Sequence, residues 1–289
     1  MYFIVQYFVG FFVVFWCEVT ILVVKAMTCQ NFNIKKMKRM VTTMKKRLLA
    51  LLLAAVSVFQ ISGTVLASDK PEEYTGPIAF PIEDDGRFDE RGCELLERGN
   101  ELIRERGFKY ITDGLPHYYQ DDSRWSSKVI ENKDQTYEST MGAAGCAIAS
   151  VAMCQNYLAG FSGTTKYNPY QIYQDTEGNA FPMMWYEMPN YYDMHVTYFK
   201  NFNNISATAA APYVAALIEE SVPVIIGLKK ASTGKTHFVV ARGYSGSTVY
   251  IYDPQKSVNK ATLAQYSSMF DGIYQIIAYD NDALIDSWL

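Results

Sequence analysis

The chain has 289 residues, of which 49% are hydrophobic and 19% are charged; this balance excludes a disordered or fibrous protein and allows one or two globular domains. Its first 67 residues hold eight basic residues and one acidic residue, so the remaining 222 carry 18 basic and 29 acidic residues, a net charge of −11. Such an acidic chain is not expected to bind nucleic acid or anionic lipid through its charge.

The N-terminal region contains two apolar segments. Residues 44–67 combine a basic head, an apolar stretch and the small residues Val65 and Ala67 at the spacing of a cleavage site, which predicts a secretory signal peptide. The apolar block from Tyr2 to Val24 is long enough to span a bilayer. We interpret residues 1–43 as a misplaced start, because a complete export signal is redundant behind a transmembrane helix; the alternative is a genuine membrane segment. The expected location is secreted or at the cell surface.

The number of cysteines does not lead us to expect a disulfide framework. Cys93, Cys146 and Cys154 follow the predicted cleavage site, and an odd number leaves at least one thiol free or paired outside the chain. No cysteine pair or histidine–cysteine cluster has the spacing of a zinc site. Neither a metal nor a cofactor is therefore expected.

Residues 68–109 are predicted to form an acidic linker followed by an amphipathic helix. The linker is rich in acidic residues and proline up to about Asp89. From Asp89 to Arg106, four apolar residues recur at helical spacing: Leu95, Leu96, Leu102 and Ile103. We interpret this helix as packed against the main domain, and the alternative is an inhibitory pro-segment.

Residues 110–289 are predicted to form one α+β domain. Helices are expected over Ala144 to Leu158, which is apolar on nearly every face, and over Ala207 to Glu220. Four β-branched and aromatic runs separated by turn residues predict strands at Val222 to Leu228, His237 to Tyr244, Thr248 to Pro254 and Ile273 to Tyr279. A helical half followed by an antiparallel sheet is an α+β arrangement.

Cys146 lies where the first of these helices is expected to begin, after a run of glycine and alanine. Unpaired N–H groups and the helix dipole at such a position stabilise a thiolate, and small neighbours let a substrate backbone approach. A buried core cysteine is the alternative, since free cysteine is among the most buried residue types. Cys146 alone therefore does not decide the function.

His237 begins a strand-like run that ends at the turn residues Ser245 to Ser247. If this run and the next form a hairpin around the turn, His237 lies opposite Asp253 to within two positions. Opposed side chains on a hairpin have Cβ atoms about 5 Å apart, close enough for a carboxylate to hold an imidazole in one tautomer. Together with Cys146, this pair predicts an activated thiol nucleophile.

Five motifs occur in the order typical of the peptidase C39-like family. They are LPHYYQDDSRW from Leu115, GCAIASVAM from Gly145, VPVIIGL from Val222, THFVVARGY from Thr236 and VYIYDP from Val249. The chain resembles this family from about Tyr110 to the C-terminus. Members of the family are related to bacteriocin leader-processing peptidases and have a papain-like fold.

The resemblance implies a papain-like cysteine peptidase fold, in which a helical half with a buried nucleophile helix packs on an antiparallel β-sheet. It implies that Cys146 is the nucleophile, His237 the general base and acid, and Asp253 the residue that orients the imidazole. Gln120 matches the glutamine whose side-chain N–H stabilises the oxyanion, beside the backbone N–H of Cys146.

We interpret the other candidate residues as structural. His117 and His195 have no acid or thiol in a comparable register, and Cys154 is expected in the core. The aromatic-rich residues 183–199 are interpreted as core packing rather than as the lining of a substrate groove.

The sequence thus predicts a secreted bacterial cysteine peptidase that hydrolyses a peptide or amide bond of a peptide or protein substrate through a thioester. Two alternatives stay open. The first is a catalytically inactive extracellular binding module of the same fold. The second is a peptidoglycan amidase or endopeptidase, with association to the cell wall. A membrane is expected as a partner only if residues 1–43 are genuine.

Overall fold

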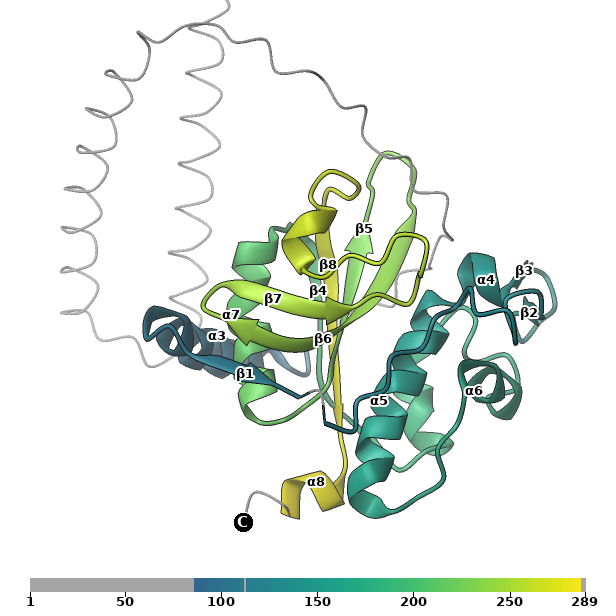
Figure 1. The fold of residues 1–289 in the computed structure, drawn as a ribbon, viewed down its shortest axis with the longest axis horizontal. Helices are drawn as coiled ribbons and strands as arrows, with labels where there is room; N and C mark the ends of the chain where they lie inside the picture. Colours follow the sequence, from purple (N-terminus) through teal and green to yellow (C-terminus); the bar gives the residue numbers. More distant parts are fainter. Residues whose placement is uncertain (1–85, 112, 287–289) are drawn as a thin grey trace, which may run out of the picture. The chain divides into compact units, whose positions relative to one another are not determined.

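Figure 1 presents the fold as a computed structural model, which describes residues 86–111 and 113–286. The predicted misplaced start, the signal peptide and most of the acidic linker lie outside the described residues. Within the described ranges, no helix is long and apolar enough to cross a membrane.

The described chain contains short and long helices on both sides of a sheet. The helices are α3 Asp89–Arg104, α4 Met141–Ala144, α5 Cys146–Ser162, α6 Pro169–Asp175, α7 Ala207–Glu219 and α8 Asp282–Asp286, with 3-10 turns η1 Trp185–Asn190 and η2 Leu263–Tyr266. The strands are β1 Phe108–Tyr110, β2 Val129–Glu131, β3 Glu138–Thr140, β4 His195–Ile205, β5 Val224–Lys229, β6 Thr236–Ser245, β7 Thr248–Tyr252 and β8 Gly272–Asp280.

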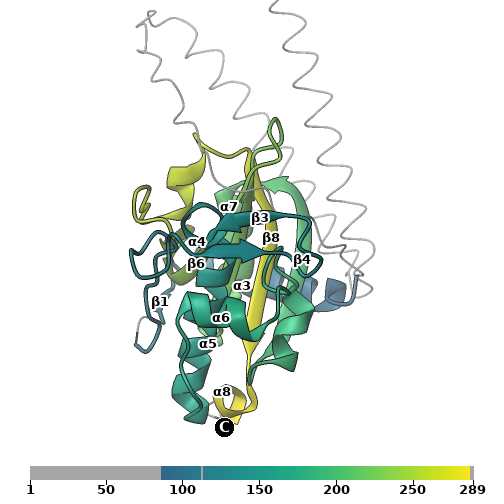
Figure 2. The same cartoon turned by 90° about the vertical axis from the view of Figure 1, so that its right-hand side faces the viewer.

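Six strands form one antiparallel sheet in the order β1-β6-β5-β8-β4, and β7 also pairs with β6. Helix α5 packs against one face of this sheet and α7 against the other, and α3 lies on the outer side of α7 (Figures 1 and 2). β2 and β3 form a separate two-stranded hairpin on the α5 side. The predicted α+β fold, with a buried helix packed on an antiparallel sheet, is confirmed.

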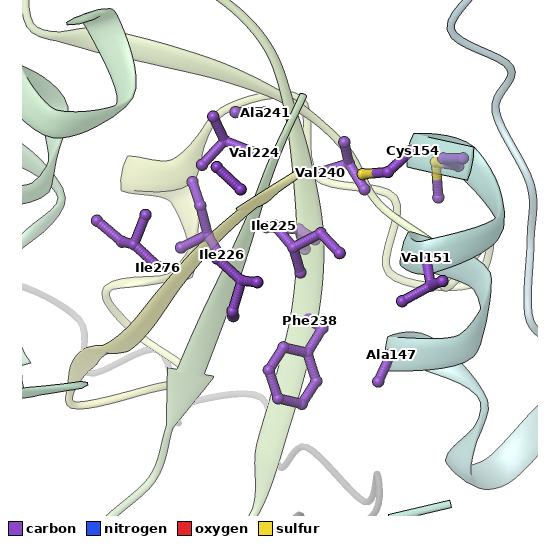
Figure 3. Packing of buried hydrophobic residues seen from close by; sticks show 14 of the residues in the cluster. Ala147, Val151, Cys154, Val224, Ile225, Ile226, Phe238, Val240, Ala241 and Ile276 are labelled. Carbon is purple, nitrogen blue, oxygen red and sulfur yellow. The ribbon is translucent and has the colours of Figure 1, made fainter. Parts of the chain in front are cut away.

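The core lies on both faces of the central strands, where α5 and α7 pack against them. Every residue of α5 from Cys146 to Ala159 is buried, including the polar Ser150, Gln155 and Asn156, as expected for a helix that is apolar on nearly every face. Figure 3 shows Val151 and Cys154 of this helix pointing toward Ile225 and Val240 of the sheet. Small and β-branched side chains let the helix backbone approach the sheet closely, which fixes the position of its N-terminus.

Several elements were not anticipated from the sequence: the short strand β1, the β2–β3 hairpin, the helices α4, α6 and α8, and the long strand β4. β4 falls partly within the aromatic-rich residues 183–199, and its pairing with β8 is interrupted by register shifts between Val196 and Tyr198 and between Asn201 and Ile205. These irregularities break the two-residue alternation that marks a strand in sequence. The aromatic segment itself is largely core, since Trp185, Met188 and Phe199 are buried.

Helix α3 is packed into the fold, close to the range predicted for it. Leu95 is buried, and Gly99 lies directly against the backbone of α7 at Pro212. Arg91 and Arg98 both form ion pairs with Glu220 beyond the end of α7, the latter at 2.7 Å. The helix therefore packs mainly on α7, and whether it is removed in maturation stays a prediction.

Gly99→Ala should destabilise the protein, because an added Cβ would lie 1.9 Å from the carbonyl oxygen of Pro212. Relieving that overlap requires α3 to move away from α7, at a cost of about 1–3 kcal/mol. Gly160→Ala is the matched control, since it adds the same methyl within α5 where nothing lies within 4 Å; there, alanine should stabilise the helix by about 0.5–1 kcal/mol. Urea unfolding measures both changes, and equal effects would contradict close α3–α7 packing.

Candidate active site

Cys146 is the first residue of α5, as predicted. Thr140 caps α4 by accepting a hydrogen bond from the backbone N–H of Ala143, and Gly145 separates α4 from α5. A Cβ at Gly145 would lie 2.5 Å from the carbonyl oxygen of Met141, so only glycine permits this tight junction. The junction places the buried thiol of Cys146 at the N-terminus of a 17-residue helix, which is the positive end of the helix dipole.

His237 lies between this thiol and a carboxylate. Its Nε2 is 2.9 Å from Oδ1 of Asp253, and both side chains are fully buried. Because Nε2 is engaged by Asp253, the other ring nitrogen is left for Cys146, which forms a side-chain hydrogen bond with the imidazole. Burial lowers the pKa of His237, but the hydrogen bonds and charges of Asp253 and Cys146 outweigh it and raise the pKa to about 9.

The hairpin geometry inferred from the sequence accounts for this pairing. β6 and β7 pair antiparallel around the turn at Gly246, with Ser245 opposite Thr248 and Val240 opposite Tyr252. Asp253 is the residue that follows the end of β7. The predicted opposition of His237 and Asp253, to within two positions, therefore agrees with the observed contact.

The Asp253 carboxylate accepts hydrogen bonds from four groups. Oδ1 accepts from His237 and from the backbone N–H of Gln255 at 2.8 Å, while Oδ2 accepts from the backbone N–H of Lys260 at 3.1 Å and from the hydroxyl of Tyr266. Burial raises the pKa of Asp253, but the bonds and charge of His237, with those of Tyr266 and Gln255, lower it overall. These contacts keep a fully buried carboxylate charged.

Tyr266 was not identified from the sequence as a site residue. It ends η2, whose capping box of Thr262 and Gln265 is a recognisable turn signal. Nothing in that signal indicates that the turn folds back on β7. The contact depends on the path of the chain between β7 and β8, which local patterns do not encode.

Gln120 lies close to both halves of the site. Its side chain is buried, and its Nε2 donates to the carbonyl oxygen of Gly142, in α4, at 2.8 Å. Its backbone N–H donates to the carbonyl oxygen of Pro254 at 2.7 Å. Oε1 finds no hydrogen-bond partner among the described residues. An amide nitrogen carries two hydrogens, so one donor remains after the bond to Gly142.

Two neighbours of Gln120 hold its segment to the loop that follows Asp253. The carboxylate of Asp121 accepts from the backbone N–H groups of Lys256, at 3.0 Å, and Ser257, at 3.3 Å. The Nε2 of His117 lies 2.7 Å from the backbone carbonyl oxygen of Asp253. These contacts fix Gln120 relative to Asp253.

His117 contacts the site through a backbone group, not through an acid side chain. Its ring stacks on Tyr252 with centroids 4.4 Å apart and lies 4.3 Å from the ring of Tyr119. Burial lowers the pKa of His117, with backbone and charge effects of Asp253 opposing it. His117 therefore lies in the loop that carries Gln120, and it packs there as a structural residue.

The remaining candidates lie apart from this cluster. His195 does have an acidic neighbour, Asp282 at 3.4 Å, but both side chains are largely exposed. Asp282 belongs to α8, 87 residues after His195, so spacing along the sequence does not predict this contact. Cys154 is free and fully buried, as expected for a core residue, whereas Cys93 is disulfide-bonded. In the described part of the chain, no group of three or more potential ligands could hold a metal ion.

The fold and the site together define a papain-like class of protein, with a cysteine at a helix N-terminus and a histidine–aspartate pair on an antiparallel sheet. Residues 114–281, more than half of the chain, match the family described as the Peptidase_C39 like family, and the chain belongs to that family. Membership indicates a cysteine peptidase.

A solved protein described as a C39-like peptidase from Bacillus anthracis is similar to this chain at 13% identity and a TM-score of 0.30. The similarity covers 59% of this chain and 96% of that protein. No curated protein matches the chain.

Proposed function

We propose that this protein is an exported cysteine peptidase that cleaves a peptide or amide bond through a thioester on Cys146. The observation that supports this most directly is the buried imidazole of His237, bonded to Asp253 at 2.9 Å and to the thiol of Cys146. An oriented base beside a thiol at a helix N-terminus is the arrangement that activates a cysteine nucleophile.

In the proposed reaction, His237 and Cys146 form an imidazolium–thiolate pair before substrate binds. The sulfur attacks the substrate carbonyl carbon, a C–S bond forms, and the carbonyl oxygen becomes an oxyanion. The imidazolium then donates its proton to the leaving nitrogen, the C–N bond breaks, and a thioester remains. His237, now neutral, accepts a proton from water as the water attacks the thioester; the C–S bond breaks and the imidazolium–thiolate pair is restored.

The oxyanion would be stabilised by the side-chain N–H of Gln120 that is not used by Gly142, beside the backbone N–H of Cys146. Donors held in place before the reaction stabilise developing charge without reorganisation. Two hydrogen bonds support this role: the side-chain amide of Gln120 is held by its bond to Gly142, and the backbone of Gln120 is held by its bond to Pro254.

Probe labelling tests the proposal. A thiol-reactive peptide probe should label Cys146 of the secreted protein at pH 6 at least about tenfold faster than in His237→Ala, since a free thiol with a pKa of about 8.5 is almost fully protonated there. The pKa of His237 is raised to about 9, so the imidazole should keep its proton up to about that pH. If the labelling rate of Cys146 instead rises with pH around the midpoint of an ordinary thiol, the inactive binding module is favoured.

Export leads to a separate prediction about the N-terminus. If Met44 is the true start and residues 44–67 are a signal peptide, N-terminal sequencing of the protein recovered from the culture medium should begin at or near Ser68. Recovery of a membrane-bound form that retains Tyr2 to Val24 would contradict it.

A further inference from the structure

The two carboxylate oxygens of Asp253 have different hydrogen-bond partners. Oδ1 faces His237 and accepts one further bond, from the backbone of Gln255. Oδ2 accepts from the backbone N–H of Lys260 and from the hydroxyl of Tyr266. Tyr266 thus supplies the one side-chain donor to Asp253 besides His237 among the described residues.

Tyr266 is held firmly in this position. η2 is anchored to β7 by a bridge between Tyr250 and Thr262 and by the bond from the backbone N–H of Ile251 to the carbonyl oxygen of Ala261. The phenol ring is almost fully buried. A hydroxyl on so fixed a ring restricts the rotation of the carboxylate that it binds.

The same ring also lies against the imidazole. The centroids of Tyr266 and His237 are 5.6 Å apart, and Phe270 stacks nearly parallel to His237 at 6.2 Å while it meets Tyr266 edge-on at 5.7 Å. The two aromatic residues form a wall that excludes water from the His237–Asp253 contact. Electrostatic interactions are stronger where water is excluded.

We propose that Tyr266 is a positioning residue that keeps Asp253 ionised and holds its Oδ1 against Nε2 of His237. The inference rests on the proposed function, since it assigns Tyr266 a part in maintaining the imidazolium–thiolate pair. A neutral hydroxyl is suited to this task, because it donates a hydrogen bond to the carboxylate without adding a charge that would compete with the imidazolium.

Removing the hydroxyl should make Asp253 easier to protonate. A hydrogen bond to the charged form of an acid favours that form, so its loss raises the pKa of the carboxyl group. Once Asp253 is protonated it no longer stabilises the imidazolium, and the thiolate of Cys146 loses its counter-charge. The rate of Cys146 alkylation falls as the pH is lowered, and we call this part of its pH profile the acid limb. The acid limb should therefore move to higher pH.

The test is the pH profile of Cys146 alkylation by iodoacetamide, followed by mass spectrometry of the full secreted protein. Tyr266→Phe should shift the acid limb upward by about one pH unit, the size expected from one hydrogen bond to a carboxylate. Tyr244→Phe is the matched control: Tyr244 is also buried and donates to a carboxylate, Glu219, at 2.9 Å. It lies seven residues along β6 from His237, roughly 23 Å away in an extended strand.

The outcomes separate the two proposals. If the wild type shows an acid limb well below that of an ordinary thiol, and Tyr266→Phe shifts it while Tyr244→Phe does not, the role of Tyr266 is supported. If Tyr266→Phe keeps the wild-type limb, or if both variants shift it equally, the role is overturned and the peptidase proposal stands. If Cys146 of the wild type is alkylated with the pH profile of an ordinary thiol, both the role of Tyr266 and the peptidase proposal are overturned.

Discussion

Cys146→Ala should abolish turnover, and His237→Ala should lower kcat/KM by at least about a thousandfold, because the members of a nucleophile–base pair act as one unit. Asp253→Ala should leave a slower, partly active enzyme, since the imidazole then loses its orienting partner but remains beside the thiol. Initial rates on a peptide pool, with each variant checked for folding by circular dichroism, measure these losses.

Cys154→Ala and His195→Ala are matched controls for this series. Cys154 is a buried cysteine of the same helix, eight residues after Cys146, and His195, the first residue of β4, pairs with the exposed Asp282 of α8. Both control variants should keep wild-type turnover, although Cys154→Ala leaves a small core cavity. A fully active Cys146→Ala protein would contradict the peptidase proposal, whatever its stability.

The contacts that the sequence predicts well are local. Cys146 begins a helix because small residues precede a long apolar run, and Asp253 meets His237 because both belong to one hairpin with a short turn at Gly246. Hairpin register follows from turn position and alternation, and both can be read from neighbouring residues. Gln120, in contrast, is assigned to the site only by the family resemblance, since no local sequence pattern connects it with Cys146.

The features that the sequence does not predict depend on contacts between distant segments. β4 is irregular, and its pairing partner β8 follows 67 residues after its end. Tyr266 reaches Asp253 because the chain after β7 turns back along that strand. The Asp121 carboxylate binds backbone N–H groups more than 130 residues away. Each of these contacts requires the tertiary path of the chain, which periodicity and turn residues alone do not define.

Gln120→Met should lower kcat/KM by about a hundredfold to a thousandfold, the loss typical when one donor to an oxyanion is removed. The substitution keeps the length of the side chain and removes its N–H groups. It also leaves the carbonyl of Gly142 without the 2.8 Å bond from Nε2, which should cost about 1–3 kcal/mol of stability. Alkylation of Cys146 should remain fast, because its imidazole partner is untouched.

Gln155→Met is the matched control that separates the loss of turnover in Gln120→Met from its loss of stability. Gln155 is also buried, its Nε2 donates to the carbonyl oxygen of Thr165 at 2.9 Å, and its Oε1, like that of Gln120, has no hydrogen-bond partner in the described part of the chain. The two variants should lose similar stability in urea unfolding, whereas only Gln120→Met should lose turnover. Equal losses of turnover would mean that Gln120 acts through packing alone, and the oxyanion would then need another donor.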